Sequence, residues 1–72
     1  MDVRVRLGRR IKQVRIDKGM SQKDLAYEAD LDRSYIASVE NGQRNISIVN
    51  IEKITKALGV SLSTLFRDAD FD

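Results

Sequence analysis

Four small or cationic side chains share one face of a short helix that the sequence predicts over residues 33–41. They are Arg33, Ser34, Ala37 and Ser38, and at about 100° per residue they lie opposite the apolar positions of the same segment. A guanidinium can donate two hydrogen bonds to a guanine, a hydroxyl can hydrogen-bond a base edge, and a methyl group can contact a thymine methyl. This face therefore predicts a helix that reads bases in a major groove; the alternative is an ordinary solvated surface.

Polar residues around this helix could bind the phosphate backbone of DNA. Asn41 lies at its end, and Gln43, Arg44 and Asn45 form a polar loop directly after it. Loops and helix starts supply many phosphate contacts in protein–DNA complexes. Tyr35 could also reach a phosphate with its hydroxyl, although packing of its ring in the core explains this residue equally well.

The chain lacks the residues on which many enzymes and metal sites depend. It has 72 residues, with no cysteine and no histidine, which excludes disulfides, common zinc sites, thiol nucleophiles and serine–histidine pairs. Five short helices leave little room for a catalytic pocket. We therefore expect no enzyme, no cofactor and no small-molecule ligand. The charged start resembles no signal peptide and no apolar run could span a membrane, so we expect a soluble, cytoplasmic protein without a membrane partner.

Charge is unevenly distributed, although the formal net charge is only +2. Residues 1–18 carry seven Lys or Arg against two Asp, whereas residues 68–72 carry three acids. A basic front would suit a polyanion on one side of the protein, and a solvated helix face is the equal alternative. Within this basic segment, we expect Arg9, Arg10 and Lys12 to attract DNA only through their electrostatic field, without direct contact.

Four helix starts follow the same pattern, in which a polar N-cap stands between two apolar residues that pack together as a hydrophobic staple. These staples pair Met20 with Leu25, Leu31 with Ile36, Ile46 with Ile51, and Val60 with Leu65. Ser21 and Asp24 approximate a capping box. The four glycines fall singly, as punctuation between elements, and Gly19, Gly42 and Gly59 could each end a helix in a left-handed conformation.

Apolar periodicity predicts an all-α fold. The expected helices cover residues 2–18, 22–29, 33–41, 48–58 and 62–67. An apolar stripe in the first of them consists of Val3, Leu7, Ile11 and Val14. The short connection between the second and third helices forces them to cross steeply, which predicts a helix-turn-helix over about 22–41. We expect residues 1–72 to form one domain.

Several short motifs occur in a fixed order along the chain. They are Ser-Gln-x-x-Leu-Ala at 21–26, the pair Ile36 and Val39, Glu-Asn-Gly at 40–42, and Ala-Leu-Gly-Val at 57–60. Together they resemble the helix-turn-helix domain of the Cro and phage-repressor family, the XRE type, over about residues 7–66. Within this family the chain is most similar to restriction-modification controller proteins, through residues 24–27, 31–36 and 44–47. The resemblance implies a compact, lambda-repressor-like domain of five helices.

One residue departs from the family pattern. The family usually has glycine in the turn between the two helices, where this chain has Asp30. Aspartate tolerates the left-handed conformation better than most residues, so we predict a positive φ at Asp30.

The resemblance also implies roles for individual residues. Gln22 would hydrogen-bond a DNA phosphate, and Arg15 would form a structural ion pair with Glu40. Segment 60–72 would form a two-fold interface. Apolar residues that this segment cannot bury by itself are Leu62, Phe66 and Phe71; the alternative is that they cover the core of their own protomer. A dimer would place its two reading helices about one DNA turn apart on a pseudo-palindromic operator.

The expected partners are double-stranded DNA and a second copy of the chain, with RNA polymerase as a further candidate. The resemblance to controller proteins implies tandem sites, with activation of restriction genes at low concentration and repression at high concentration. A small phage or plasmid repressor fits almost as well. An antitoxin-type or scaffold module that binds a protein is the remaining alternative.

Overall fold

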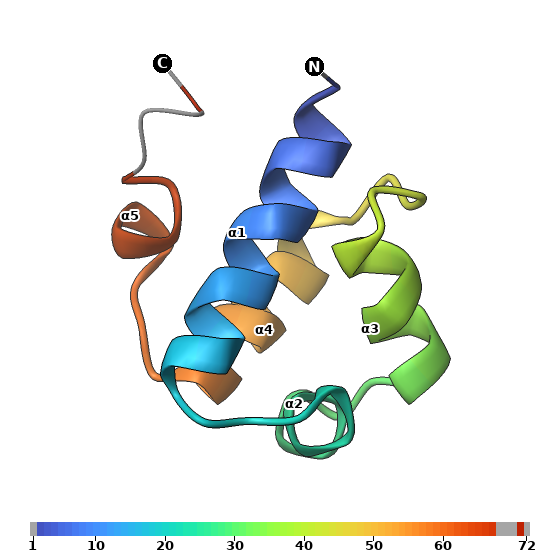
Figure 1. Ribbon diagram of the computed structural model, residues 1–72. Coiled ribbons are helices and arrows are strands. Elements are labelled where there is room, and N and C mark those ends of the chain that lie inside the picture. Colours follow the sequence, from blue (N-terminus) through green and yellow to red (C-terminus); the bar gives the residue numbers. More distant parts are fainter. Residues whose placement is uncertain (1, 68–70, 72) are drawn as a thin grey trace.

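The computed structural model describes residues 2–67 and 71, and within them it contains helices but no β-strand (Figure 1). The helices are α1 (Val3–Asp17), α2 (Gln22–Ala29), α3 (Arg33–Glu40), α4 (Ile48–Leu58) and α5 (Leu62–Leu65). The predicted all-α class and the five helices are confirmed. Three predicted ends are one or two residues too long, because Lys18, Asn41 and Phe66 are C-caps with non-helical backbone. In this part of the chain no helix is long and apolar enough to cross a membrane.

Serine side chains begin three of the five helices. The hydroxyls of Ser21, Ser47 and Ser61 each accept a hydrogen bond from the backbone N–H three residues later, at 2.9–3.1 Å. The Asp24 carboxylate completes the predicted capping box by accepting from the Ser21 N–H at 2.9 Å, and these bonds lower the pKa of Asp24. Asp32, before α3, accepts no such bond from the residues that the structure describes.

The turn between α2 and α3 has the predicted left-handed residue. Asp30 has φ 56° and ψ 46°, which confirms the expectation for this position. The N–H of Leu31 then donates to the Ala26 carbonyl at 2.9 Å, so the chain reverses within four residues. Ala26 itself is buried, and its methyl group lets the two helices approach each other.

Gly8 does not mark an element boundary, and the prediction that all four glycines punctuate the chain is wrong at this position. It lies inside α1, where a Cβ atom would stand 2.4 Å from the Val39 carbonyl oxygen and 2.7 Å from that of Glu40. The absence of a side chain therefore lets α1 cross the end of α3 in backbone contact. Such a contact between distant residues leaves no local pattern in the sequence.

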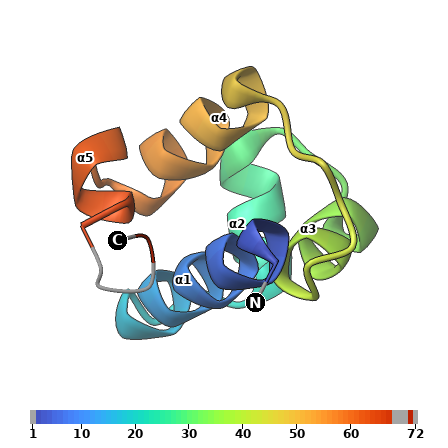
Figure 2. The same cartoon turned by 90° about the horizontal axis from the view of Figure 1, so that it is seen from above.

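The core takes one fully buried large side chain from every helix. They are Ile11, Leu25, Ile36, Ile54 and Leu65, each with none of its surface exposed. The helical members of the four predicted staples are buried, and the members that precede the N-caps are partly buried and pack against the core. Val3, by contrast, is 54% exposed, so the apolar stripe of α1 begins at Leu7 and not at Val3. In both views α3 and α5 lie on opposite sides of the molecule (Figures 1 and 2), and Figure 2 shows α1 and α4 facing each other between them.

Candidate nucleic-acid interface

α3 turns one side away from the core along its whole length. The four residues that the sequence predicts as base readers lie on this side: Arg33 and Ser34 in the first turn are exposed, and Ala37 and Ser38 in the next turn are half-buried. Ile36 on the opposite side is fully buried and anchors the helix. In helix-turn-helix proteins the N-terminal residues of the second helix contact base edges, and here this end carries an exposed guanidinium.

A second guanidinium is held against α3 from the loop that follows it. Arg44 Nε donates to Ser38 Oγ at 3.0 Å, and Arg44 Cζ lies 5.3 Å from the centre of the Tyr35 ring. The Ser38 hydroxyl donates in turn to the Tyr35 carbonyl at 2.8 Å. A cation–π contact and a hydrogen bond thus order a long side chain before any ligand arrives, which reduces the entropy cost of binding. The Ser38 hydroxyl is engaged, and the group that it presents outward is Arg44.

Tyr35 combines the two interpretations that the sequence left open. Its ring is half-buried and packs against the core, while its hydroxyl accepts a hydrogen bond from the Asn50 side-chain amide at 3.1 Å. A phenol that accepts one bond keeps its own proton for donation, so this hydroxyl can still donate to a phosphate. Sequence reasoning missed Asn50 because fifteen residues separate the partners and no motif joins them; a polar residue in the first turn of α4 was the only signal.

The start of α2 is joined to a buried ion pair. Arg15 Nε lies 2.7 Å from Glu40 Oε2, and the two side chains are 9% and 2% exposed. A second nitrogen of Arg15 donates to Glu40 Oε1 at 3.1 Å and a third to the Met20 carbonyl at 2.7 Å. Gln22 Nε2 donates to Glu40 Oε1 at 3.2 Å. The ion pair implied by the resemblance is thus present, and it orients the Gln22 amide, which keeps a second N–H for a phosphate.

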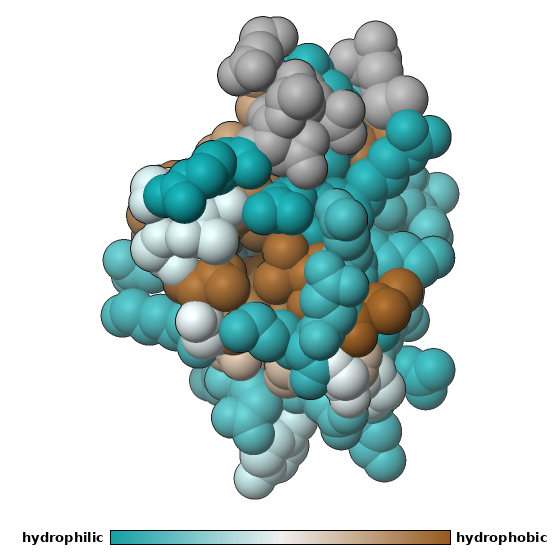
Figure 3. Space-filling view, turned by 60° about the vertical axis from the view of Figure 1, so that its left-hand side comes forward, coloured by the Kyte–Doolittle hydropathy of each residue, from teal (hydrophilic) through white to brown (hydrophobic). Residues whose placement is uncertain are grey.

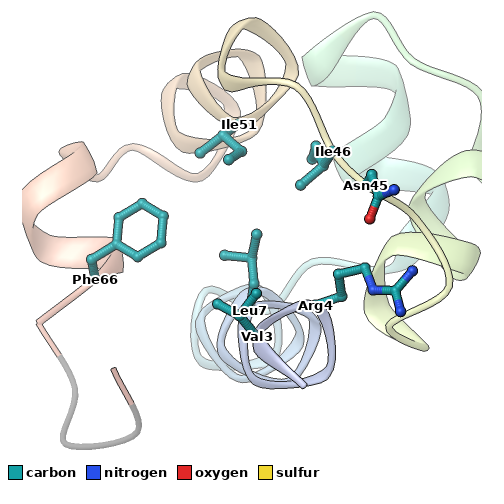
Figure 4. Close-up of a pocket in the computed structure, with 7 residues that line it drawn as sticks. All are labelled: Val3, Arg4, Leu7, Asn45, Ile46, Ile51 and Phe66. Carbon is teal, nitrogen blue, oxygen red and sulfur yellow. The ribbon is translucent and has the colours of Figure 1, made fainter. Parts of the chain in front are cut away.

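The loop after α3 separates residues that the sequence grouped together. Asn41, Gln43, Arg44 and Asn45 are all exposed, and the Gln43 N–H holds the beginning of the loop on α3 by donating to the Ser38 carbonyl at 2.9 Å. Asn45 instead lines an apolar groove near the start of α1 (Figure 4). The structure therefore brings Arg44 to α3 and places Asn45 at the groove.

Some cations of residues 1–18 make contacts within the protein itself. The Arg4 guanidinium lies 2.7 Å from the Asp2 carboxylate, and its hydrogen bonds lower the pKa of Asp2 to about 2. Arg10 donates to backbone carbonyls in α5. Arg9 and Lys12 on α1 are exposed. The cations of α1 thus do not form one continuous DNA-binding face.

Of segment 60–72, predicted to form a dimer interface, residues 68–70 and 72 lie outside the described residues, and the three predicted contact residues are partly exposed. Leu62 and Phe71 are half-buried and pack against the core, as the alternative interpretation expected. Phe66 is 37% exposed, and its ring meets that of Phe71 edge to face, with centres 5.2 Å apart. Other exposed aliphatic side chains lie outside the predicted segment: Val3 and Ile16 in α1 at 54% and 56%, and Ile48 and Val49 in the first turn of α4 at 63% and 60%.

An apolar groove of about 330 Å³ lies between α1, the start of α4 and α5. Its lining consists of Val3, Arg4, Leu7, Asn45, Ile46, Ile51 and Phe66. In the close-up the Phe66 ring stands on one side of the opening, with Arg4 and Asn45 on the other (Figure 4). The surface view from the α5 side shows apolar atoms gathered among polar ones (Figure 3). This surface is open to a further apolar side chain.

Comparison with known proteins connects this geometry to a family. Residues 11–65 match the sequence model described as helix-turn-helix. The control protein C.MunI of a Mycoplasma species is 47% identical over 70 residues, which are 96% of this chain and 95% of that protein.

Solved structures give the same result. The restriction-modification controller protein C.AhdI from Aeromonas hydrophila has a TM-score of 0.85 and 48% identity, over 88% of this chain and 96% of that one. The controller protein C.Esp1396I, crystallised as a tetramer with its natural 35-base-pair operator, has a TM-score of 0.86 and 41% identity, over 92% of this chain and 87% of that one.

Proposed function

The chain belongs to the helix-turn-helix family of DNA-binding transcription regulators, and we propose that it serves as the controller protein of a restriction-modification system. Identity of 47–48% over most of both chains supports this role. These relatives are regulators, and we propose that this chain likewise catalyses no reaction and acts on DNA in the cytoplasm.

The observation that carries the proposal is the exposed side of α3 with two guanidinium groups. Arg33 lies on the helix itself, and Arg44 is held against it from the following loop. Arg33 is exposed at the N-terminal end of the helix, where it can fork onto a guanine in the major groove. Ser34 beside it can bond a neighbouring base edge, and Ala37 can contact a thymine methyl. Arg44, held on Ser38 and over a tyrosine ring, lies at the rim of this face and can enter the groove or bind the flanking phosphate.

Phosphate contacts on either side would set the register of α3 in the groove. We assign them to Gln22 at the start of α2, to the Tyr35 hydroxyl, and to Asn41 and Gln43 in the loop. The first two are supported by their fixed orientation, because Glu40 holds the Gln22 amide at 3.2 Å and Asn50 holds the Tyr35 hydroxyl at 3.1 Å. Asn45, which faces the apolar groove, is the weakest member of the predicted set.

The proposed dimer uses the apolar groove. Val3 and Phe66, which line it, are 54% and 37% exposed, and covering such side chains with those of a second copy is favourable. We propose that exposed Ile48 and Val49 in the first turn of α4 extend this contact. Leu62 and Phe71, which pack against the core, would help to hold Phe66 in place. A two-fold contact here would place two α3 helices about 34 Å apart, one DNA turn, and predicts an inverted-repeat operator.

Control of transcription would follow from the number of dimers on the operator. C.Esp1396I assembles on its operator as a tetramer, and we propose two dimers on tandem sites here, with activation at low concentration and repression at high concentration. Activation also requires a contact with RNA polymerase, which we propose as the third partner.

The test is selection of duplexes from a random DNA pool at near-physiological salt, followed by sequencing of the retained fraction. We expect an inverted repeat whose half-sites lie about one turn apart. Arg33→Ala should weaken binding by about 1–3 kcal/mol and relax the preference at one base position per half-site. Arg9→Ala, which removes an exposed cation of α1, is the matched control and should keep every preference. Absence of enrichment would instead indicate a protein-binding module.

A further inference from the structure

The Arg10 side chain links α1 to α5 by hydrogen bonds. Its Nε donates to the Leu65 carbonyl and its Nη2 to the Thr64 carbonyl, both at 2.9 Å. These bonds join residues 54 and 55 positions apart, and the guanidinium is part-buried where it makes them. The Arg10 guanidinium thus donates hydrogen bonds to two successive backbone carbonyls at the C-terminal end of α5.

α5 needs such support because it is a single turn of four residues. A helix this short is not stable by itself, and the carbonyls of its last turn depend on partners beyond the helix. The Ser61 hydroxyl caps its N-terminus. At its C-terminus the Arg67 N–H donates to the Thr64 carbonyl at 3.2 Å, and Arg10 adds bonds from α1 to the Thr64 and Leu65 carbonyls. A cation at this end also interacts favourably with the helix dipole.

The Leu65 carbonyl that Arg10 binds lies directly before the exposed aromatic residue, Phe66. Leu65 is fully buried, and Phe66, the next residue, is 37% exposed and lines the groove. The Leu65 carbonyl belongs to the peptide that joins Leu65 to Phe66, so the bond from Arg10 restricts how this peptide can turn and thereby restricts the backbone from which the Phe66 side chain starts. Figure 4 shows the Phe66 ring at one side of the groove.

We infer that Arg10 is a positioning residue for dimerisation, which sets Phe66 for contact with a second copy of the chain and so controls operator affinity without touching DNA. This inference rests on the homodimer proposed above. It replaces the expectation that Arg10 acts on DNA through its field, because a guanidinium that holds two carbonyls of α5 is directed to the dimer surface.

The test measures the dimer dissociation constant by sedimentation equilibrium for four proteins: wild type, Arg10→Gln, Arg10→Lys and the control Arg9→Gln. Arg9→Gln makes the same charge change at the neighbouring exposed position and should leave dimerisation unchanged. Arg10→Gln should weaken it roughly tenfold, the effect of losing one charge-assisted hydrogen bond. Arg10→Lys should fall between, because an ammonium group keeps the charge without the planar fork. A lysine variant identical to wild type would overturn the inference, and this variant decides the matter if Arg10→Gln does not fold.

A double-mutant cycle separates positioning from general stabilisation. In a Phe66→Ala background, Arg10→Gln should weaken dimerisation no further, because the ring that it positions is gone. The same tenfold loss in that background would show that Arg10 acts by another route. The salt dependence of operator binding should keep its slope in Arg10→Gln, whereas a lost phosphate contact would reduce the slope by about 1.

The outcomes also distinguish this inference from the proposed function. A wild-type protein that neither dimerises nor selects an operator refutes both. A wild-type dimer that binds its operator, with Arg10→Gln equally dimeric, refutes the role of Arg10 alone.

Discussion

Replacement of Glu40 by alanine should destabilise the fold far more than the loss of an ordinary surface charge. The change removes both bonds between Glu40 and Arg15 and the bond from Gln22. It leaves the Arg15 guanidinium, whose side chain is 9% exposed, with its bond to the Met20 carbonyl but without a carboxylate. Breaking a buried ion pair on one side costs about 3–5 kcal/mol because the other charge stays buried without compensation.

That loss is large for a chain of 72 residues. At about 0.05–0.15 kcal/mol per residue, the whole fold is stable by roughly 4–11 kcal/mol. Each kcal/mol shifts the Tm of a domain of this size by about 4–8 °C, so the Tm of Glu40→Ala should fall by roughly 12–40 °C. Thermal unfolding followed by far-ultraviolet circular dichroism measures this directly.

Two matched proteins make the reasoning refutable. Glu52→Ala breaks an exposed pair with Lys56, whose atoms lie 3.7 Å apart, and should change the free energy of unfolding by about 0.5 kcal/mol or less. The double variant Arg15→Met/Glu40→Leu removes both buried charges and should recover most of the stability. If Glu40→Ala costs no more than Glu52→Ala, the pair does not stabilise the fold. If the double variant is as unstable as Glu40→Ala, the cost comes from packing and not from a stranded charge.

Two further predictions concern positions of known geometry. Gly8→Ala should lower the free energy of unfolding by about 1–3 kcal/mol in a denaturant titration, because its Cβ would stand 2.4 Å from the Val39 carbonyl oxygen; a gain, as alanine gives in ordinary helices, would contradict the close crossing. The pKa of Asp24 is lowered below its ordinary 3.8 by its hydrogen bonds with Ser21, so its capping contribution is present above that pH and is lost as the pH falls through the folded-state pKa. Asp24→Asn should therefore show a shallower loss of stability than wild type below pH 3.8, and equal pH profiles would refute the capping role.

Elements held together by neighbouring residues were predictable. The serine caps, the capping box of Ser21 and Asp24, and the left-handed turn at Asp30 all involve groups within a few residues of one another. Their hydrogen bonds are local, so residue types at fixed spacing are enough to predict them. The exposed face of α3 followed in the same way from helical periodicity, and with it the surface position of Arg33.

Pairings between distant residues required other information. The Arg15–Glu40 pair spans 25 positions, and only the family resemblance implied it. No motif joins Tyr35 to Asn50 or Arg44 to Ser38, since each contact depends on how the loop after α3 and the start of α4 fold back. Leu62 shows what hydrophobicity cannot predict for an apolar residue. It indicates that the side chain is covered, but not whether its own protomer or a second copy covers it.

The sequence alone thus determined the helices, the turn between α2 and α3, and which side of α3 is exposed, because backbone hydrogen bonding and 3.6-residue periodicity act over short spans. Only the tertiary structure decided that Gly8 is a crossing point, that Arg10 serves α5, and that Val3 and Ile48 lie at the surface. The physical reason is that each of these depends on which helices pack together and at what angle, and close packing transmits that choice to individual side chains.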